Sequence, residues 1–566
     1  MTDRPSQTIV IVGGVAGGAS AAARARRLDE HARIVLFEKD AHVSFANCGL
    51  PYYIGREIEE RDDLLVAKPD LLRERFNLDV RTRCEVLSID REKKTVRVRA
   101  LDEDRAFEQS YDNLILAPGA EPIVPPIDNA RAPGVFTLRN LDDTDAIDAH
   151  LSSAKPERAV VVGAGFIGLE MVEQLRRRGV AVALAELAPQ VLPPLDADMA
   201  RFVEAELARH GVELHLSDGI AGVRTNPDGS AAGVTLSSGA EIDARLVILG
   251  VGVRPMTRLA ADAGIRLGAT GAIATDRFCR TSDPDVYAVG DAAEYEHRVT
   301  GRPTRAPLGG PANRAGRVAG EHAASGVSAG LAPVTTTAIV RVFGLAAGAT
   351  GLSVRAARRA GFDARAAVIA AKHHAGYYPG AERLVLKLVY DGATGRVLGA
   401  QAVGPEGVDK RLDVVSTAIH FGATIDDLAG LDLAYAPPFG SAKDPVHMAA
   451  FAAQNDRAGL VPLVQPDEPM AAGEQVVDVR TPAERDAFRL VGSTHIEIES
   501  LRSRAGELDR SRPVATVCHS GLRAHAAARI LRGLGFPRVR NITGGMMLAE
   551  HTRAESIERP EPAPTN

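Results

Sequence analysis

The stretch Thr8-Ile-Val-Ile-Val-Gly-Gly-Val-Ala-Gly-Gly18 decides the fold of the first part of this chain. A β-branched run meets a cluster of glycines, Ala19–Leu28 follows with helix-forming residues, and Ile34–Phe37 is predicted to be a second strand. The pattern predicts a βαβ unit. It returns where Ala159–Val162 leads into Gly163-Ala-Gly-Phe-Ile-Gly168. We therefore expect an α/β chain with two Rossmann-like domains.

Glycines at such a turn let the backbone approach the pyrophosphate of a dinucleotide, and an acid about 20 residues later binds the ribose. The second unit satisfies this motif with Gly163, Gly165, Gly168 and Glu186. Glu186 favours NADH over NADPH, because a carboxylate would repel a 2′-phosphate. The first unit departs from the motif, since Val15 stands where a second glycine is expected. Its predicted cofactor-binding residues are Gly13, Gly14, Val15, Ala16, Gly18, Glu38 and Lys39.

Length and composition limit the remaining possibilities. At 566 residues the chain is expected to hold three to four domains. Its net charge of −6 at pH 7 argues against a basic surface that binds nucleic acid. The four cysteines are too far apart in sequence for a zinc site or a disulfide scaffold, so no metal site is predicted. With no signal peptide pattern and no long apolar run, we expect a cytoplasmic protein without a membrane partner.

A third nucleotide-binding element, Val286-Tyr-Ala-Val-Gly-Asp291, is a predicted strand that ends on an acid. With it, residues 7–455 resemble the pyridine nucleotide-disulfide reductases. The resemblance implies that the first unit binds FAD, that the second binds NAD(P)H as electron donor, and that Asp291 bonds the flavin ribityl chain. The expected organisation is an FAD-binding domain (1–150 and 283–332), an NAD(P)-binding domain (151–282), an α+β dimerisation domain (333–455), a linker (456–472) and a small α/β domain (473–555).

One cysteine lies where a redox pair might be expected. Cys48 follows Glu38 closely in Ser44-Phe-Ala-Asn-Cys-Gly-Leu-Pro-Tyr-Tyr53, and no second cysteine follows within this stretch. A lone thiolate beside a flavin has two sensible fates, a mixed disulfide with a small external thiol or oxidation to a sulfenic acid. An inert buried cysteine is the alternative.

The segment around Cys48 resembles the coenzyme A disulfide reductases. The resemblance implies that Cys48 forms a mixed disulfide with CoA, and that Arg24, Arg27, Ser44 and Asn47 bind CoA. The stretches His374–Gly380 and Ala434–Asp444 extend it. They imply a homodimer in which Tyr377 and Tyr435 of the partner subunit lie near the substrate sulfur and Lys443 binds substrate. Core or interface aromatics remain the alternative for the tyrosines, and Phe439-Gly440 departs from the Tyr-Ser usual in that family.

A second candidate thiol lies near the C-terminus in Cys518-His-Ser-Gly-Leu-Arg523. It follows the apolar run Val514–Val517 and opens a predicted helix, so loop amides, the helix dipole and Arg523 favour an anionic sulfur. The loop is one residue shorter than the C-x5-R loop that cradles phosphate. It resembles the single-domain rhodaneses, as do Val477-Asp-Val-Arg480 with Glu484 and Asn541–Gly545. That resemblance implies sulfane sulfur on Cys518. Cys84 and Cys279 are interpreted as structural.

Together these patterns predict an FAD-dependent NAD(P)H reductase of CoA disulfide, CoA persulfide or polysulfide, fused to a rhodanese domain. The resemblance implies that CoA is a substrate or a bound co-thiol. Two alternatives remain open. One is an NADH oxidase or peroxidase in which Cys48 cycles through a sulfenic acid. The other is a reductase whose rhodanese domain only binds sulfur or docks.

Overall fold

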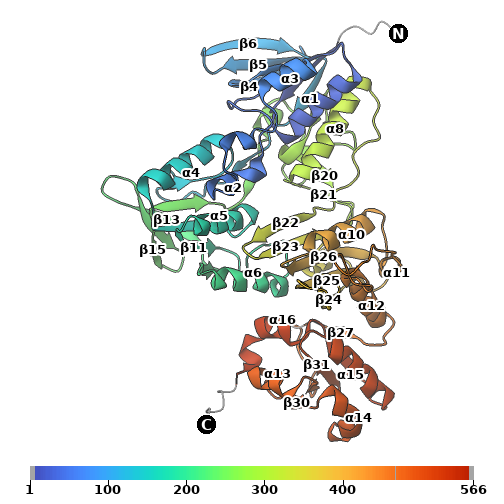
Figure 1. Ribbon diagram of the computed structural model, residues 1–566. Helices are drawn as coiled ribbons and strands as arrows, with labels where there is room; N and C mark the ends of the chain where they lie inside the picture. Colours follow the sequence, from blue (N-terminus) through green and yellow to red (C-terminus); the bar gives the residue numbers. More distant parts are fainter. Residues whose placement is uncertain (1–6, 466, 560–566) are drawn as a thin grey trace. The chain divides into compact units, whose positions relative to one another are not determined.

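The computed structural model describes residues 7–465 and 467–559. The chain divides into two compact units (Figure 1). Unit 1 comprises Met1–Pro189 and Gly211–Thr336, and unit 2 comprises Gln190–His210 and Thr337–Asn566, in each case within the described residues.

The first sheet of unit 1 confirms the predicted βαβ unit. Its five strands are parallel and lie in the order β19 (Val286–Ala288), β7 (Asn113–Leu116), β1 (Thr8–Val12), β2 (Arg33–Phe37) and β3 (Asp79–Arg81). Helix α1 (Ala16–Leu28) connects β1 to β2 and lies beside α8 (Gly309–Ser325) (Figure 1). The two helices approach closely because Gly316 faces the backbone of Gly17 and Gly320 faces that of Ala21.

The second sheet repeats this architecture. Its parallel strands lie in the order β12 (Glu213–Leu216), β11 (Ala181–Glu186), β10 (Arg158–Val162), β16 (Leu246–Leu249) and β9 (Val135–Phe136). Helix α5 (Phe166–Arg177) connects β10 to β11. In both sheets the central strands are buried runs of Val, Ile, Leu and Ala, as expected for parallel strands covered on two faces.

Smaller elements complete unit 1. Its further strands are β4 (Cys84–Asp90), β5 (Thr95–Ala100), β6 (Arg105–Ser110), β8 (Ala120–Pro122), β13 (Ile220–Thr225), β14 (Ala231–Leu236), β15 (Glu241–Asp243), β17 (Val253–Pro255), β18 (Ile273–Ala274), β20 (Ala293–Glu296) and β21 (Pro303–Thr304). Its further helices are α2 (Leu50–Ile54), α3 (Pro69–Phe76), α4 (Leu141–Ala154) and α7 (Arg258–Asp262).

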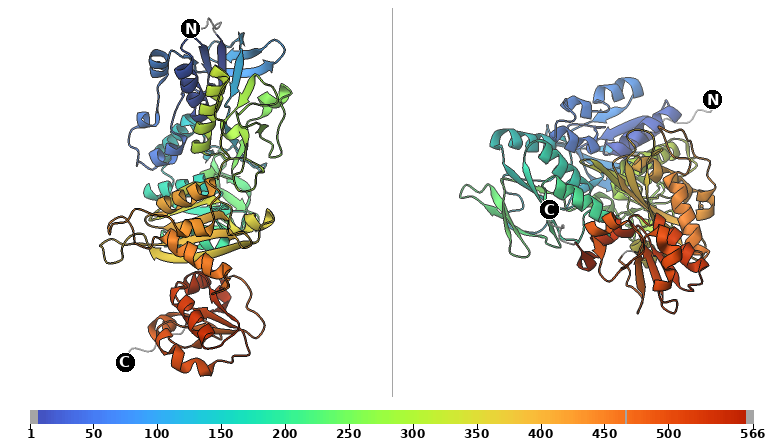
Figure 2. Two further views of the ribbon diagram at one scale, coloured as in Figure 1. Left: turned by 90° about the vertical axis from the view of Figure 1, so that its right-hand side faces the viewer. Right: turned by 60° about the horizontal axis from the view of Figure 1, so that its bottom comes forward.

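Unit 2 begins with an antiparallel sheet in the order β22 (Ala338–Val342), β23 (Leu345–Gly351), β26 (Val397–Gly404), β25 (Arg383–Asp391) and β24 (Ala364–Lys372). Helix α10 (Val408–His420) packs on β23 and β26, and α12 (Pro445–Arg457) packs on β24 and β25 (Figure 2). The helices α9 (Val354–Arg359) and α11 (Ile425–Ala429) complete this α+β part.

Helix α6 (Ala197–Arg209) lies within the segment predicted to belong to the NAD(P)-binding domain but packs on β26 in unit 2. A buried ion pair anchors its start, since Lys387 Nζ on β25 lies 2.9 Å from Asp198 Oδ1 and 3.1 Å from Asp196 Oδ2. Burial alone would lower the pKa of Lys387, but the two carboxylates raise it above its ordinary value. The lysine is therefore charged, and the two carboxylates compensate its charge.

The C-terminal part of unit 2 is a parallel sheet in the order β27 (Leu463–Val464), β32 (Val539–Ile542), β31 (Val514–Val517), β28 (Gln475–Asp478) and β30 (Thr494–His495). Around it lie α13 (Pro482–Ala487), α14 (Leu501–Arg504), α15 (Leu522–Gly533), α16 (Gly545–Thr552) and the short strands β29 (Arg489–Leu490) and β33 (Ile557–Glu558). Strand β27 falls within 456–472, so part of the expected linker takes part in this sheet.

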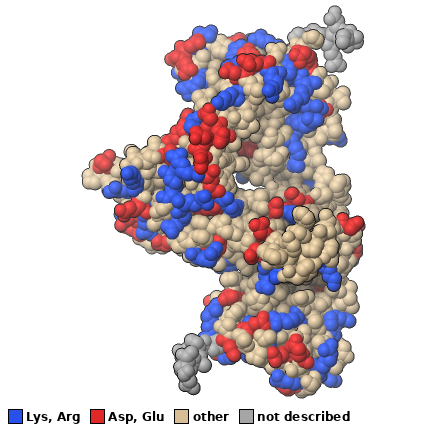
Figure 3. Space-filling view, viewed as in Figure 1, with Lys and Arg blue, Asp and Glu red and all other residues tan. Residues whose placement is uncertain are grey.

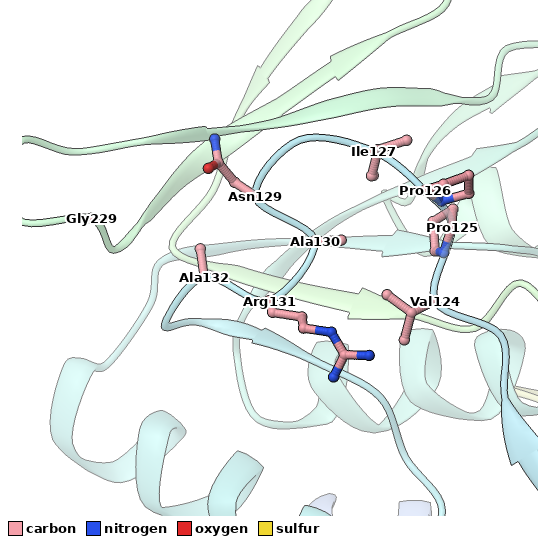
Figure 4. A pocket seen from close by; sticks show the side chains of 9 residues that line it. All are labelled: Val124, Pro125, Pro126, Ile127, Asn129, Ala130, Arg131, Ala132 and Gly229. Carbon is pink, nitrogen blue, oxygen red and sulfur yellow. The ribbon is translucent and has the colours of Figure 1, made fainter.

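The described surface offers few other candidate sites. Figure 3 shows acidic and basic side chains interspersed on one face. A cavity of about 590 Å³ lies in unit 1 (Figure 4). Its lining is Val124, Pro125, Pro126, Ile127, Asn129, Ala130, Arg131, Ala132 and Gly229. The cavity contains no thiol, imidazole or carboxylate and none of the predicted site residues.

The glycine turns generate a stability prediction. A β-carbon at position 168 would lie 1.9 Å from the carbonyl oxygen of Gly163, whereas at position 165 it would meet no atom within 4 Å. We expect Gly168→Ala to destabilise the protein by at least about 1–3 kcal/mol, as overpacking does. Gly165→Ala is the matched control and should unfold at the wild-type temperature. Thermal denaturation of both variants checks this, and equal melting temperatures would contradict it.

Candidate active sites

The two glycine turns form similar cradles at the helix N-termini. Gly13 and Gly163 have φ angles of +95° and +100°, which favour glycine. A β-carbon at Gly18 would lie 1.8 Å from Gly13 O, just as one at Gly168 would lie 1.9 Å from Gly163 O. Val15 precedes α1 in the position that Gly165 has before α5, and Ala16 is the first residue of α1. The open space at Gly165 suits the close approach of a pyrophosphate.

An acid closes each cradle. Glu38 Oε2 accepts a hydrogen bond from Gly14 N (2.8 Å), and Glu186 Oε2 accepts one from Ala164 N (2.6 Å). Burial raises the pKa of Glu38, although backbone amides oppose this shift. Lys39, which follows Glu38, is exposed. Both predicted ribose-binding acids therefore lie at their glycine turns.

Asp291 lies directly after β19, in the short helix Gly290–Ala292. Because β19 is parallel to β7 and β7 to β1, Asp291 lies at the same edge of the sheet as the first glycine turn. Burial raises the pKa of Asp291, and the nearby Arg139 partly opposes the shift. A half-buried carboxylate at this edge fits the hydroxyl groups of a nucleotide cofactor.

Cys48 occupies the short helical turn Asn47–Gly49, directly before α2, and is exposed to solvent. Protein atoms packed around its sulfur nonetheless raise the pKa of the thiol, and the carboxylates of Glu170 and Asp291 raise it further. Glu170 comes from α5 and accepts a hydrogen bond from Tyr52 Oη (3.2 Å). The structure thus brings Cys48, Asp291 and α5 of the second nucleotide-binding region together within unit 1.

Sequence reasoning missed Glu170 and Tyr52. Tyr52 lies inside the recognised stretch around Cys48 and Glu170 follows the second glycine motif, but no local pattern shows that residues 118 positions apart are hydrogen-bonded. Only the packing of α2 on α5 does so.

The four predicted CoA-binding residues of unit 1 have different environments. Ser44 has a φ angle of +50°, a strained conformation of the kind found at functional sites. Asn47 Nδ2 donates to Arg139 O (3.2 Å). Arg24 forms an ion pair with Glu321 (3.0 Å), whereas Arg27 is exposed and lies over the ring of Phe76. Arg27 is therefore the more available of the two cations.

In unit 2, the predicted tyrosines form a pair. The hydroxyl oxygens of Tyr377 and Tyr435 lie 3.3 Å apart, and the side chains are 77% and 51% exposed. Their hydrogen bond raises the pKa of Tyr377 above its ordinary value. Lys443 is also exposed. The paired hydroxyls are thus presented to the outside of the unit.

A buried ion pair holds both tyrosine loops. Arg411 Nη2 on α10 lies 2.7 Å from Asp444 Oδ2, which follows the Tyr435 loop, and donates to His373 O (2.6 Å), which precedes Tyr377. Ala375 N also donates to Gly440 O (2.9 Å). Sequence reasoning missed Arg411, because its partners lie 33 and 38 residues away.

Cys518 lies at the end of β31 and is only 1% exposed. Gly521 N donates to its Sγ (3.1 Å), and Arg523 interacts with the sulfur from the first turn of α15. Two hydrogen bonds of 2.6 and 2.8 Å join Arg523 to Glu484 and lower the pKa of Glu484 to about 2. The structure therefore brings together three residues that the sequence analysis singled out.

The other motif residues of this part are structural. Asp478 and Arg480 are fully buried and form an ion pair (2.8 Å), and Arg480 Nη2 also donates to Phe488 O (2.6 Å). Cys84 and Cys279, which were interpreted as structural, are buried, and burial raises the pKa of Cys279 to about 12. Among the described residues, no cluster of His, Cys, Asp or Glu could hold a metal ion, and no helix is long and apolar enough to cross a membrane.

Comparison with known proteins agrees with this arrangement. The family model for pyridine nucleotide-disulphide oxidoreductases matches residues 7–310, more than half of the chain. The chain belongs to this family. The dimerisation domain of the same family matches residues 337–445, and the rhodanese-like domain matches residues 466–549. The predicted fold class is confirmed, and the family implies FAD and NAD(P)H as cofactors.

Three similar proteins match most of the length of this chain. The coenzyme A disulfide reductase of Staphylococcus haemolyticus (strain JCSC1435) is 36% identical over 447 residues, which are 79% of this chain and 99% of the relative. The crystal structure of reduced Bacillus anthracis CoADR-RHD is 42% identical, with a TM-score of 0.94, and the match covers 98% of this chain and 99% of that one. The NAD-dependent persulfide reductase from A. fulgidus is 38% identical, with a TM-score of 0.90, over 96% and 99%. The expected cytoplasmic compartment stays a prediction.

The environment of Cys48 generates a prediction about its reactivity. Glu170→Gln removes one of the carboxylates that raise the pKa of this thiol, so the thiolate should form at lower pH. We expect the pH profile of Cys48 alkylation by iodoacetamide to shift to lower pH, with a several-fold higher rate at pH 8. Peptide mass spectrometry measures the rate. The exposed Glu157→Gln is the control, and an unshifted profile in Glu170→Gln would argue against the electrostatic account.

Proposed function

We propose that this protein is an FAD-dependent NAD(P)H reductase of CoA disulfide, CoA persulfide or polysulfide. Cys48 is its redox cysteine, and its rhodanese domain handles sulfane sulfur on Cys518. One observation carries the proposal: Cys48 is exposed near both nucleotide-binding regions, whereas the other cysteines of unit 1, Cys84 and Cys279, are buried. Unit 1 therefore offers Cys48 no second accessible thiol, and the relatives named above point to CoA as its redox partner.

The reaction needs one bond to form and one to break at each step. Cys48 thiolate attacks a sulfur of CoA disulfide, a Cys48–CoA mixed disulfide forms, and CoA thiolate leaves and takes a proton. When bound, FAD supplies two-electron transfer from NAD(P)H, which cleaves this mixed disulfide to CoA thiol and Cys48 thiolate. With CoA persulfide, the group that leaves in the first step is hydrosulfide. Each turnover consumes one NAD(P)H and one proton.

Named residues of the chain bind the cofactors and the substrate for these steps. Gly13, Gly14, Val15, Ala16, Gly18, Glu38, Lys39 and Asp291 hold FAD, and Gly163, Gly165, Gly168 and Glu186 hold NAD(P)H. Arg24, Arg27, Ser44 and Asn47 bind CoA, and Lys443 binds substrate. The exposed Tyr377 and Tyr435 donate hydrogen bonds to the leaving thiolate of the partner subunit and lower the cost of its charge. The family's dimerisation domain supports the homodimer that this arrangement needs.

An oxidase is the second candidate function. The water-forming NADH oxidase from Lactobacillus brevis is 27% identical, with a TM-score of 0.76, and the match covers 80% of this chain and 100% of that one. The rhodanese-like domain matched at residues 466–549 favours sulfur chemistry over oxygen chemistry. NADH consumption with oxygen alone, at the rate seen with disulfide or persulfide, would favour the oxidase over the reductase.

Substitution of each thiol tests the proposal. Cys48→Ser removes the attacking sulfur, so NADH oxidation with CoA disulfide, CoA persulfide and polysulfide should fall by at least about 10³-fold. Cys518→Ala should keep CoA disulfide reduction but abolish sulfur transfer from thiosulfate. Undiminished turnover in Cys48→Ser would exclude the mechanism. Unchanged sulfur transfer in Cys518→Ala would reduce the C-terminal domain to a docking module.

Nucleotide preference follows from Glu186. Its carboxylate closes the second cradle, and it would repel the 2′-phosphate of NADPH, so we propose that NADH is preferred. Glu186→Gln should improve kcat/KM for NADPH relative to NADH by about tenfold, which corresponds to about 1.4 kcal/mol. Steady-state kinetics with both nucleotides measures the ratio. A ratio that does not change, or a wild-type preference for NADPH, would refute this assignment.

A further inference from the structure

Within unit 2, the C-terminal sheet is attached to the edge strand β24 by two side chains. Thr543 Oγ1, directly after β32, accepts a hydrogen bond from Val368 N (2.8 Å) and donates one to Val368 O (3.1 Å). Gln465 Nε2 donates to Ala366 O (2.9 Å). The outer backbone groups of an edge strand need partners, and these side chains supply them. The attachment lies next to the Cys518 loop, since Met546 N donates to Cys518 O (2.8 Å).

Arg383 extends this attachment to the loop itself. It is the first residue of β25, which is paired with β24, and its Nη1 lies 3.2 Å from Nε2 of His519. A guanidinium group only donates hydrogen bonds, so Nε2 of His519 accepts. The ring hydrogen of the neutral imidazole is then on Nδ1. A residue of the dimerisation domain thus sets the tautomer of the histidine that follows Cys518.

The charges around His519 favour its neutral form. Burial lowers its pKa, and so does the neighbouring Arg383. Arg480, after β28, and Arg523, on α15, act in the same direction, while Glu484, on α13, opposes them. Met547 N donates to His519 O (3.0 Å) and fixes the backbone at this residue. The residue after Cys518 therefore carries an imidazole that its surroundings keep neutral to lower pH.

We propose that Arg383 is a positioning residue of the Cys518 sulfur-transfer site and acts through His519, whose tautomer and orientation it sets. This proposal rests on the proposed function of Cys518. The substrates of the site are anionic donors of sulfane sulfur, such as thiosulfate or a persulfide, and the dimerisation domain completes the site that accepts them.

Sulfur transfer at Cys518 takes place in two steps. Cys518 thiolate attacks the sulfane sulfur of thiosulfate, the S–S bond breaks, and sulfite leaves with the electron pair while a Cys518 persulfide forms. Cyanide then takes the terminal sulfur as thiocyanate and restores the thiolate. A protonated His519 would add a positive charge next to Cys518, which would stabilise its thiolate and make it a weaker nucleophile toward the sulfane sulfur of thiosulfate. Keeping His519 neutral therefore keeps the Cys518 thiolate nucleophilic over a wider pH range.

Thiosulfate–cyanide sulfur transfer by the full-length holoenzyme tests the role of Arg383. Arg383→Met removes a positive neighbour, so the pKa of His519 should rise and the acid limb of the pH profile should move up by about 0.5–1 pH unit. Arg383→Lys keeps the charge and a donor and should restore the profile. Arg383→Gln keeps only a donor and should leave it shifted. The exposed Arg358→Met on α9 is the control and should not shift it.

Two further measurements make the test specific. In a His519→Gln background, Arg383→Met should have no further effect, because the residue acts through the histidine. NADH-dependent reduction of CoA disulfide should not change in any of these variants. An unshifted profile in Arg383→Met, an additive effect in the double variant, or an equal loss in Arg383→Lys would overturn the proposal.

A readout without turnover separates this proposal from the function on which it rests. The pH dependence of Cys518 alkylation by iodoacetamide, followed by peptide mass spectrometry, should shift in Arg383→Met and not in the control Arg358→Met. If wild-type protein transfers no sulfur but this shift is present, the proposed function of Cys518 fails and the positioning role stands. If sulfur transfer is present and neither profile shifts, the positioning role fails.

Discussion

The close contact between the third glycine of each turn and the carbonyl of the first glycine is the constraint on which unit 1 depends. At both Gly18 and Gly168 a β-carbon would lie less than 2 Å from that carbonyl oxygen. Each helix can therefore start directly above the end of its strand, with its first amides directed to one place. The acids Glu38 and Glu186 then reach back to the same turns. The repeated geometry produces two nucleotide cradles in one unit.

The reactivity of Cys48 depends on the groups that lie around these turns. It lies near Asp291 from the edge of the first sheet and near Glu170 from α5, and both carboxylates disfavour its thiolate. A thiol in this setting is not activated by its protein neighbours alone. Its reactivity depends on what binds beside it, which agrees with a cysteine that works together with a cofactor and an external thiol. In unit 2, a buried residue likewise supports exposed ones, because Arg411 holds the loops of two exposed tyrosines.

Local patterns were sufficient to predict the two βαβ units, the strand before Asp291, and the loop that joins Cys518 to Arg523. These features depend on glycine, alternation and apolar runs within about 30 residues. The grouping of α6 with unit 2 could not be predicted, because it rests on a buried lysine that pairs with carboxylates 189 and 191 residues away in sequence. The contacts of Glu170, Arg411 and Arg383 were missed for the same reason. The strand β27 was concealed by a Pro-rich stretch typical of a linker.

The central claim is that Cys48 takes CoA as its redox partner, and mass spectrometry of the purified protein after incubation with CoA disulfide tests it most directly. The account predicts one CoA per chain, on the peptide that contains Cys48, and its release on addition of NADH. A protein that carries no CoA, or that carries it on another cysteine while Cys48 stays free, would contradict the account.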